Sequence, residues 1–291
     1  MRRISEVTPS FAFPPAFSNQ KGAMDQSIDP LLNHTARMGQ QQMFSKEWYD
    51  EYFRRAEGSP THSRFCERVY GIDLCQHGMM DGQGLDFLTS LIQPGERVLE
   101  LGCSNGHITE YLQCGTAAEF LGIDYSDVAI GQALLRTEKK RKILDFRCVD
   151  LIHEEIPGQE YDLILAIDCL FFMGNYETIL RKLKAKLAEE GRMILTTFQT
   201  KEEKDAGSLL QPAGTRLAQA LRSSGFDFSF YDLTSNIRNH WMQNFHFAHE
   251  LKNSFLAEGN RFLWEARTAE NGWFRAHAEN RTLVRFLYVV R

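Results

Sequence analysis

The amino-acid sequence predicts an α/β fold, a doubly wound and mostly parallel sheet with helices on both of its faces. Between residues 97 and 198, short apolar runs alternate with helical stretches, which is the order expected of a parallel sheet with crossover helices. Each early run is apolar at nearly every position, as burial on both faces of a sheet requires. The 291 residues are 43% hydrophobic and 24% charged, an ordinary balance for a folded globular protein.

The first part of the chain carries little strand signal. Residues 1–43 contain four prolines among Ser, Gln and Asn without a sustained period, so we predict a disordered tail in which Met24 is an alternative start. Residues 44–95 are predicted to form an N-terminal helical cap. Its helices are expected from Ser45, over 61–70 and over 84–92.

Residues 96–291 are predicted to form the main domain. Its expected strands are 97–101, 119–123, 144–149, 161–167, 192–198, about 226–232 and 283–290. Helices are expected up to residue 115, after Ser126, over 176–188 and over 214–223. A helical lid insertion, at about 234–280, precedes the last strand.

The stretch Val98–Gly106, VLELGCSNG, predicts a buried strand that runs through a tight turn into a helix. Gly102 lets the turn form and lets a ligand lie against bare backbone. The first amide groups of the following helix have no intrahelical partner, so a bound molecule can use them.

Four acidic residues are also placed where a ligand would bind. Glu100, Asp124, Asp150 and Asp168 lie at or near the carboxyl ends of four successive predicted strands. In an open α/β sheet, ligands bind at this edge. Each acid alone could be a turn former or a helix cap, but four at one edge beside a glycine turn predict a binding site.

Two familiar ligand sites explain this pattern poorly. A dinucleotide site with G-x-G-x-x-G would need glycine at Ser104 and His107, and Glu100 and Asp168 would face a pyrophosphate. A serine hydrolase would use Ser104 in the G-x-S-x-G sequence at 102–106. Upstream of residue 97, however, we find neither the extra strands nor the glycine-rich oxyanion loop of that fold.

A ligand with a ribose, an adenine and a cationic end fits better. Asp124 follows Gly102 by 22 residues, the spacing of ribose-binding acids, and one carboxylate accepts hydrogen bonds from both ribose hydroxyls. Asp150 would accept from the adenine amino group, and Glu100 and Asp168 would lie near positive charge. S-adenosylmethionine has these features.

Five segments carry a family resemblance: VLELGCSNGHIT, FLGIDYS, FRCVDL, YDLILAIDCLFFM and GRMILTTF. In this order and spacing, over about 97–198, they resemble the motifs of class I S-adenosylmethionine-dependent methyltransferases, which have a Rossmann-like fold. Ser104 departs from the glycine common in the family. The resemblance implies a cofactor site made of Glu100, Gly102, Cys103, Gly106, Asp124, Asp150, Leu151 and Asp168, with no metal. It places Glu100, Gly102 and Gly106 at the methionine moiety and Asp168 at the amino-acid end.

The segments before and after residues 97–198 are expected to select the molecule that accepts the methyl group. In the lid insertion, Trp241, Phe245, Ala248 and Phe255 fit one face of a helix. The resemblance implies that such an insertion and the N-terminal helices cover the methyl group, over a small-molecule acceptor. A hydroxyl or protonated amine would also need a base, for which His240, His77 and Tyr49 are candidates.

The composition limits the classes of partner that we expect for this protein. The net charge of −5 makes nucleic acid an unlikely partner, and no stretch is long and apolar enough to span a membrane. The six cysteines form no C-x-x-C pair and predict free thiols in a reducing, cytoplasmic setting. We therefore predict methyl transfer to a small molecule, at a nitrogen, oxygen or carbon. The alternatives are the serine hydrolase and a non-catalytic subunit that only binds S-adenosylmethionine.

Overall fold

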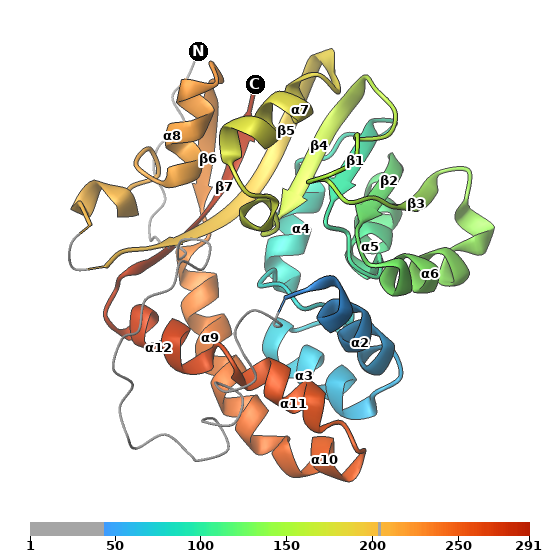
Figure 1. Cartoon of the computed structure of the whole chain (residues 1–291), viewed down its shortest axis with the longest axis vertical. Helices are drawn as coiled ribbons and strands as arrows, with labels where there is room; N and C mark the ends of the chain where they lie inside the picture. The colour runs from blue at the N-terminus through green and yellow to red at the C-terminus, as the bar shows by residue number, and fades with distance from the viewer. Residues whose placement is uncertain (1–43, 203–204) are drawn as a thin grey trace.

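The computed structural model describes residues 44–202 and 205–291, so the tail predicted over 1–43 lies outside the described residues. Seven strands form one sheet in the order β3-β2-β1-β4-β5-β7-β6 (Figure 1). They are β1 (Arg97–Leu101), β2 (Glu119–Asp124), β3 (Leu144–Cys148), β4 (Tyr161–Ile167), β5 (Leu187–Thr200), β6 (Phe228–Asp232) and β7 (Leu283–Val290). Neighbouring strands are parallel except for β7, which runs antiparallel to β5 and β6. The predicted mostly parallel α/β sheet is confirmed.

Helices cover both faces of the sheet. On one face lie α4 (Gly82–Ser90), α5 (His107–Thr116) and α6 (Asp127–Arg136), and on the other lie α7 (Tyr176–Lys184) and α8 (Arg216–Ser223). Successive residues of β4 serve the two layers: Leu163 and Leu165 pack under α4 to α6, whereas Ile164 and Ala166 pack under α7 and α8. This double burial explains why the sequence of β4 is apolar throughout.

A second group of helices lies beyond the carboxyl ends of the parallel strands, and we call it the cap layer (Figure 1). Its members are α2 (Lys46–Ala56), α3 (Pro60–Tyr70), α9 (Thr234–Glu250), α10 (Lys252–Ala257), α11 (Arg261–Thr268) and α12 (Asn271–Glu279). Tyr52, Phe65, Phe255 and Trp264 form part of one apolar cluster within it. Segments from both ends of the described chain therefore build one layer, whereas α4 packs on the sheet instead.

Local sequence explains where the helices begin. The hydroxyls of Ser45, Ser59 and Ser126 accept hydrogen bonds from the first turns of α2, α3 and α6, and Pro60 occupies the first helical position of α3. Three short 3-10 helices complete the described elements: η1 (Glu138–Lys140), η2 (Leu170–Met173) and η3 (Gly207–Leu210). Across the described residues, every helix is too short or too polar to span a bilayer.

The largest difference from the predicted boundaries lies between α7 and β5. The helix expected over 176–188 ends at Lys184, and β5 already begins at Leu187. The backbone N–H of Tyr161 donates to the carbonyl of Lys186 at 2.9 Å, and Tyr161 pairs with Leu187. Pairing with β4 thus overrides the helical pattern of Ala185 to Ala188.

Candidate functional site

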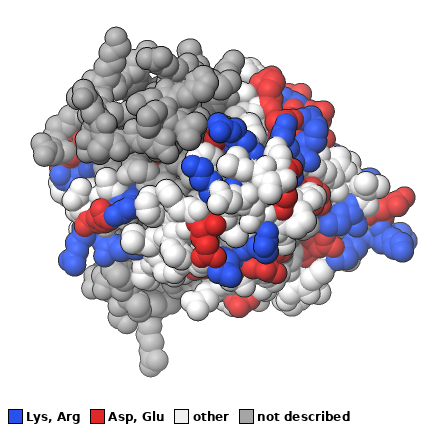
Figure 2. All heavy atoms as spheres, turned by 90° about the horizontal axis from the view of Figure 1, so that it is seen from below, with Lys and Arg blue, Asp and Glu red and all other residues white. Residues whose placement is uncertain are grey.

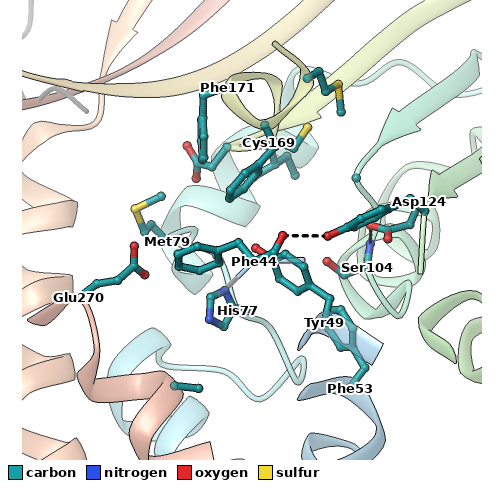
Figure 3. A pocket seen from close by; sticks show the side chains of 18 of the residues that line it. Phe44, Tyr49, Phe53, His77, Met79, Ser104, Asp124, Cys169, Phe171 and Glu270 are labelled. Atoms are coloured by element: carbon teal, nitrogen blue, oxygen red, sulfur yellow. Dashed lines mark hydrogen bonds between the residues drawn. The ribbon is translucent and has the colours of Figure 1, made fainter. Parts of the chain in front are cut away.

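A cavity of about 460 Å³ lies between the carboxyl edge of the sheet and the cap layer. Aromatic and sulfur-containing side chains line much of it: Phe44, Tyr49, Phe53, Met79, Phe171, Phe172, Met173, Trp241 and Phe274. Figure 3 shows Asp124 and Ser104 on one side of this space and Glu270 on the opposite side, with His77 and Phe44 between them. The cavity thus has a polar end at the sheet edge and a largely aromatic end at the cap layer.

The glycine turn forms one wall. Gly102 has φ +65°, and a Cβ at this position would lie 2.8 Å from Cβ of Cys169. Only glycine satisfies both requirements without strain. Gly102 and the next residue but one, Ser104 (φ +55°), line the cavity, so ligand atoms can lie directly against the backbone.

Asp124 lies at the end of β2 beside this turn. Its carboxylate accepts hydrogen bonds from the backbone N–H groups of Ser104, at 3.0 Å, and Ser126, at 2.9 Å. Burial raises the pKa of Asp124, and the hydrogen bonds from Ser126 and Ser104 oppose that rise. The carboxylate is therefore oriented by two separate loops, with its remaining acceptor capacity facing the cavity.

Asp150 and Leu151 follow β3 and also line the cavity. The Asp150 carboxylate accepts from the backbone N–H of Ile152 at 2.9 Å and contacts Nδ1 of His153 at 2.7 Å. The hydrogen bond with His153 is the main reason why the pKa of Asp150 is lowered. This wall offers an apolar surface from Leu151 next to a charged acceptor, as an adenine would require.

Asp168 lines the cavity as predicted, but it already has a cationic partner. Arg285 on β7 forms an ion pair with both carboxylate oxygens, and the two side chains are 1% and 2% exposed. The hydroxyl of Thr196 donates to the same carboxylate at 3.0 Å. We predicted that this acid would meet the positive charge of the ligand, whereas the structure shows that the protein supplies a positive charge of its own. The sequence did contain a sign of this buried ion pair, since Arg285 is the single charged residue in the apolar run 283–290.

Glu100 of β1 and the turn residues Cys103 and Gly106 do not line the cavity. Glu100 is buried, and burial raises its pKa to about 7. A Cβ at Gly106 would lie 2.5 Å from the ring of Phe146. These residues shape the turn from behind, and their predicted contact with the cofactor remains a prediction.

The three candidate bases, Tyr49, His77 and His240, all line the cavity. Burial raises the pKa of Tyr49 well above its usual value, so its phenol stays protonated at neutral pH. Burial also lowers the pKa of His77 well below its usual range and that of His240 to about 3. Both imidazoles are therefore neutral and are weak bases.

Glu270 is a cavity residue that the sequence analysis did not identify. It directly precedes α12 and is the N-cap residue of that helix. Burial raises its pKa to about 7, and the charge of Arg267 opposes this rise. Nothing in the local sequence Ala-Glu-Asn distinguishes it from a surface acid, because only the fold of the lid insertion turns it inward.

The hydrolase alternative gains no support from the geometry. Ser104 lies at the cavity, but within the described residues no histidine hydrogen-bonds its hydroxyl. His277, a histidine that follows Ser104 in the chain, contacts the hydroxyl of Thr282 at 2.8 Å. A nucleophilic serine needs an adjacent base, and this turn lacks one.

The cysteine and histidine residues of the N-terminal helices also meet in space. Sγ of Cys66 and Sγ of Cys75 lie 3.8 and 4.0 Å from Nδ1 of His62. The guanidinium of Arg267 contacts Nε2 of the same imidazole at 2.8 Å. A buried cation already occupies this cluster, and no group of three or more His, Cys, Asp or Glu side chains in the described part of the chain could hold a metal ion.

Comparison with known proteins agrees with this architecture. A family model described as a methyltransferase domain matches residues 92–247. The chain is 27% identical over 185 residues to a ubiquinone biosynthesis O-methyltransferase of Rhodopseudomonas palustris (strain BisB5). That match covers 62% of this chain and 66% of the relative, just under two thirds of the relative's length.

Two solved structures share the fold at low sequence identity. Phosphoethanolamine N-methyltransferase 2 of Haemonchus contortus, in complex with S-adenosyl-L-methionine, superposes with a TM-score of 0.65 at 13% identity, over 83% of this chain and 59% of that one. The cyclopropane synthase MmaA2 of Mycobacterium tuberculosis superposes with a TM-score of 0.62 at 12% identity, over 83% and 96%. Together with the strand order, the glycine turn and the matched family model, these findings show that the chain belongs to the class I S-adenosylmethionine-dependent methyltransferases, whose cofactor is S-adenosylmethionine.

Proposed function

We propose that this protein transfers the methyl group of S-adenosylmethionine to a small-molecule acceptor. The observation that carries the proposal is a single cavity that joins the ribose-type carboxylate of Asp124 and the bare backbone of Gly102 to an aromatic chamber under the cap layer. Two similar proteins, a ubiquinone biosynthesis O-methyltransferase and a phosphoethanolamine N-methyltransferase, have names that are consistent with a small acceptor.

The residues present fit the cofactor. Asp124 would hold the ribose hydroxyls, Leu151 and Asp150 would flank the adenine, and Gly102 would face the methionine part. When bound, S-adenosylmethionine supplies a methyl group on a positively charged sulfur. Aromatic rings such as Tyr49 and Phe171 favour a nearby cation through their electron-rich faces.

The chain contributes alignment and exclusion of water. Holding donor and acceptor in line supplies roughly 7–11 kcal/mol of the barrier in well-oriented systems. The cap layer provides the walls for this: Tyr49 and Phe53 of α2, Trp241 of α9 and Phe274 of α12 enclose the aromatic end.

The face of the molecule drawn in Figure 2 does not favour a nucleic-acid substrate. On the face drawn in Figure 2, Lys and Arg side chains are interspersed with Asp and Glu. A basic segment at the end of α6, residues 136–142, is also partly neutralised, because Arg136 and Lys140 both pair with Glu110. The six free cysteines fit the proposed cytoplasmic setting.

Calorimetric titration with S-adenosylmethionine and S-adenosylhomocysteine tests the cofactor site, and we expect both to bind at one site per chain. Transfer of a labelled methyl group is then measured over a broad metabolite panel, with Ser104→Ala as a second protein. A hydrolase would lose its activity in Ser104→Ala, whereas a methyltransferase keeps it. Binding without transfer to any metabolite would favour the non-catalytic subunit, and absence of binding would refute the proposal.

A further inference from the structure

The strand at one edge of the sheet, β6, has no neighbouring strand on its outer side within the described residues (Figure 1). We propose that this edge pairs with β6 of a second copy of the chain, antiparallel and about a two-fold axis at Phe230, so that two seven-stranded sheets become continuous. The inference does not rest on the proposed function, because no residue of β6 lines the cavity.

Alternate backbone groups of β6 are bonded to β7. The N–H of Asp227, just before the strand, donates to the carbonyl of Arg291 at 3.1 Å, and the N–H of Leu233, just after the strand, donates to the carbonyl of Arg285 at 2.9 Å. In an antiparallel pair, every second residue bonds to the neighbouring strand. The odd-numbered residues from 227 to 233 therefore bond to β7.

The even-numbered residues, Phe228, Phe230 and Asp232, point their backbone N–H and C=O groups away from β7. None of these groups has a hydrogen-bond partner in the described part of the chain. Unpaired backbone groups along a sheet edge are a template for another strand. A second β6 with Phe230 opposite Phe230 would pair all of them, because Phe228 then lies opposite Asp232 of the other copy and each such pair exchanges two hydrogen bonds.

The sequence of β6 lacks the features that usually protect a sheet edge. Charged side chains, prolines and bulges block pairing at exposed edges. The strand at the opposite edge, β3, carries Asp145 and Arg147, whose charged groups lie 3.7 Å apart. In β6 only the last residue is charged, and the central residue, Phe230, is a large apolar side chain that is 38% exposed. This difference favours a partner at β6 over one at β3.

The charges beside the edge are complementary under the same two-fold axis. Phe228 and Asp232 share the face of the sheet that α8 covers, because side chains alternate along a strand. The guanidinium of Arg222 on α8 lies 5.4 Å from the centre of the Phe228 ring. Since Phe228 lies opposite Asp232 of the second copy, Arg222 comes within reach of that carboxylate, and the axis repeats the contact. Neither Arg222 nor Asp232 forms an ion pair with another described residue.

The other face of β6 has room for the side chain that would meet it. Tyr231 points to the face that carries α4 and contacts Phe87 there, with ring centroids 4.8 Å apart. A groove of about 690 Å³ between the end of α4 and β6 is lined by Ser229 and Tyr231 among others. In the proposed register, Tyr231 of the second copy lies opposite the small Ser229 and projects over this groove. A large side chain therefore meets a small one at both symmetry-related positions.

Sedimentation velocity of the full chain over a range of concentrations tests the interface. We expect a monomer–dimer equilibrium that depends on concentration, because an interface between two short strands is small. Phe230→Lys places like charges opposite each other at the axis and should raise the dissociation constant at least about tenfold. Leu135→Lys, at a 78% exposed residue of α6, is the matched control and should dimerise as the wild type does.

Two results of this measurement would overturn the inference. One is a wild-type chain that stays monomeric up to about 0.5 mM, a concentration at which complexes of micromolar affinity are fully formed. The other is a dimer that Phe230→Lys leaves intact, because such a dimer would use another surface.

A charge exchange tests the register. In a dimer of Arg222→Asp chains an acid meets an acid at both contacts, and in a dimer of Asp232→Lys chains a base meets a base, so each variant alone should dimerise at least about tenfold more weakly. An equimolar mixture of the two variants restores opposite charges at both contacts and should dimerise again. Thermal unfolding checks that each variant is folded, and a mixture that dimerises no better than its components would refute the proposed pairing.

Discussion

Arg285 on the last strand and Asp168 at the end of β4 form a fully buried ion pair at the wall of the cavity. Nε of Arg285 donates to Asp168 at 3.1 Å, and its Nη1 donates to the carbonyl of Met79 at 2.9 Å. The guanidinium therefore ties three segments together: the antiparallel strand, the carboxyl edge of the sheet and the loop before α4. Asp168 itself has φ +50°, so this contact also holds an uncommon backbone conformation in place.

Replacing Arg285 by Met should destabilise the protein strongly. The variant leaves the Asp168 carboxylate buried without its partner, a change that costs about 3–5 kcal/mol. Urea unfolding at pH 7 measures the free energy of unfolding directly.

The double variant Asp168→Asn/Arg285→Met removes both charges and should recover part of the loss. Arg275→Met, which breaks an exposed pair with Glu279, is the matched control and should change stability by less than about 1 kcal/mol. Equal stability of the two single variants would contradict this account.

Replacing Asp124 by Asn should weaken cofactor binding. The two carboxylate oxygens accept from Ser104 and Ser126, and an amide offers only one acceptor oxygen. Loss of a hydrogen bond to a charged group costs about 1.5–3 kcal/mol, which is roughly 10- to 150-fold in affinity. Calorimetry with S-adenosylhomocysteine measures the change. Asp127→Asn, an exposed acid three residues further on, should bind as the wild type does, and an unaffected Asp124→Asn would remove this residue from the site.

Gly106→Ala should destabilise the fold, whereas Gly131→Ala should not. At Gly106, φ is +73° and the added methyl group would lie 2.5 Å from Phe146 and 2.9 Å from Ala133. Overpacking of this kind costs about 1–3 kcal/mol. Gly131 lies within α6 with no atom within 4 Å of the new Cβ, so alanine should stabilise that helix by about 0.5–1 kcal/mol. Thermal unfolding of both variants compares them, and a stable Gly106→Ala would show that the turn can relax.

The contact between α2 and the glycine turn should depend on pH. Glu57 accepts from Nδ2 of Asn105 at 2.7 Å and lies 3.2 Å from Nε2 of His107. Burial raises the pKa of Glu57, but the hydrogen bond with His107 and the charges of His107 and Arg136 outweigh it, so the net pKa is lowered. A lowered pKa contributes stability above the unfolded value of about 4.3, and this contribution is lost as the pH falls through the folded value.

The measurement compares the free energy of unfolding of the wild type with that of Glu57→Gln across this range. The wild type should be more stable at pH 7, and the difference should shrink as the solution becomes more acidic than about pH 4.3. Glu67→Gln, an exposed acid on α3, serves as the control. A difference that stays constant with pH would show that the Glu57 charge plays no part.

Much of the fold was predictable because its signals are local. The strands 97–101, 161–167 and 283–290 were predicted with the boundaries that the structure shows, since each is an apolar run between turn residues. The end of α7 was wrong because strand pairing at Leu187, a long-range interaction, overrides a helical pattern. The antiparallel direction of β7 also depends on pairing and has no signature in the sequence of that strand alone.

The sequence alone determined the sheet, its glycine turn and the row of acids at one edge, because alternation of burial, positive φ and chain spacing are properties of short segments. Tertiary structure alone decided how those acids are used. It brought Arg285 across the sheet to neutralise Asp168, and it folded the lid insertion so that Glu270 and Trp241 face the same cavity. Arg285 lies more than a hundred residues from Asp168 in the chain, and so does Glu270 from Asp124, which it faces across the cavity. No local pattern records a relationship between side chains so far apart in the chain.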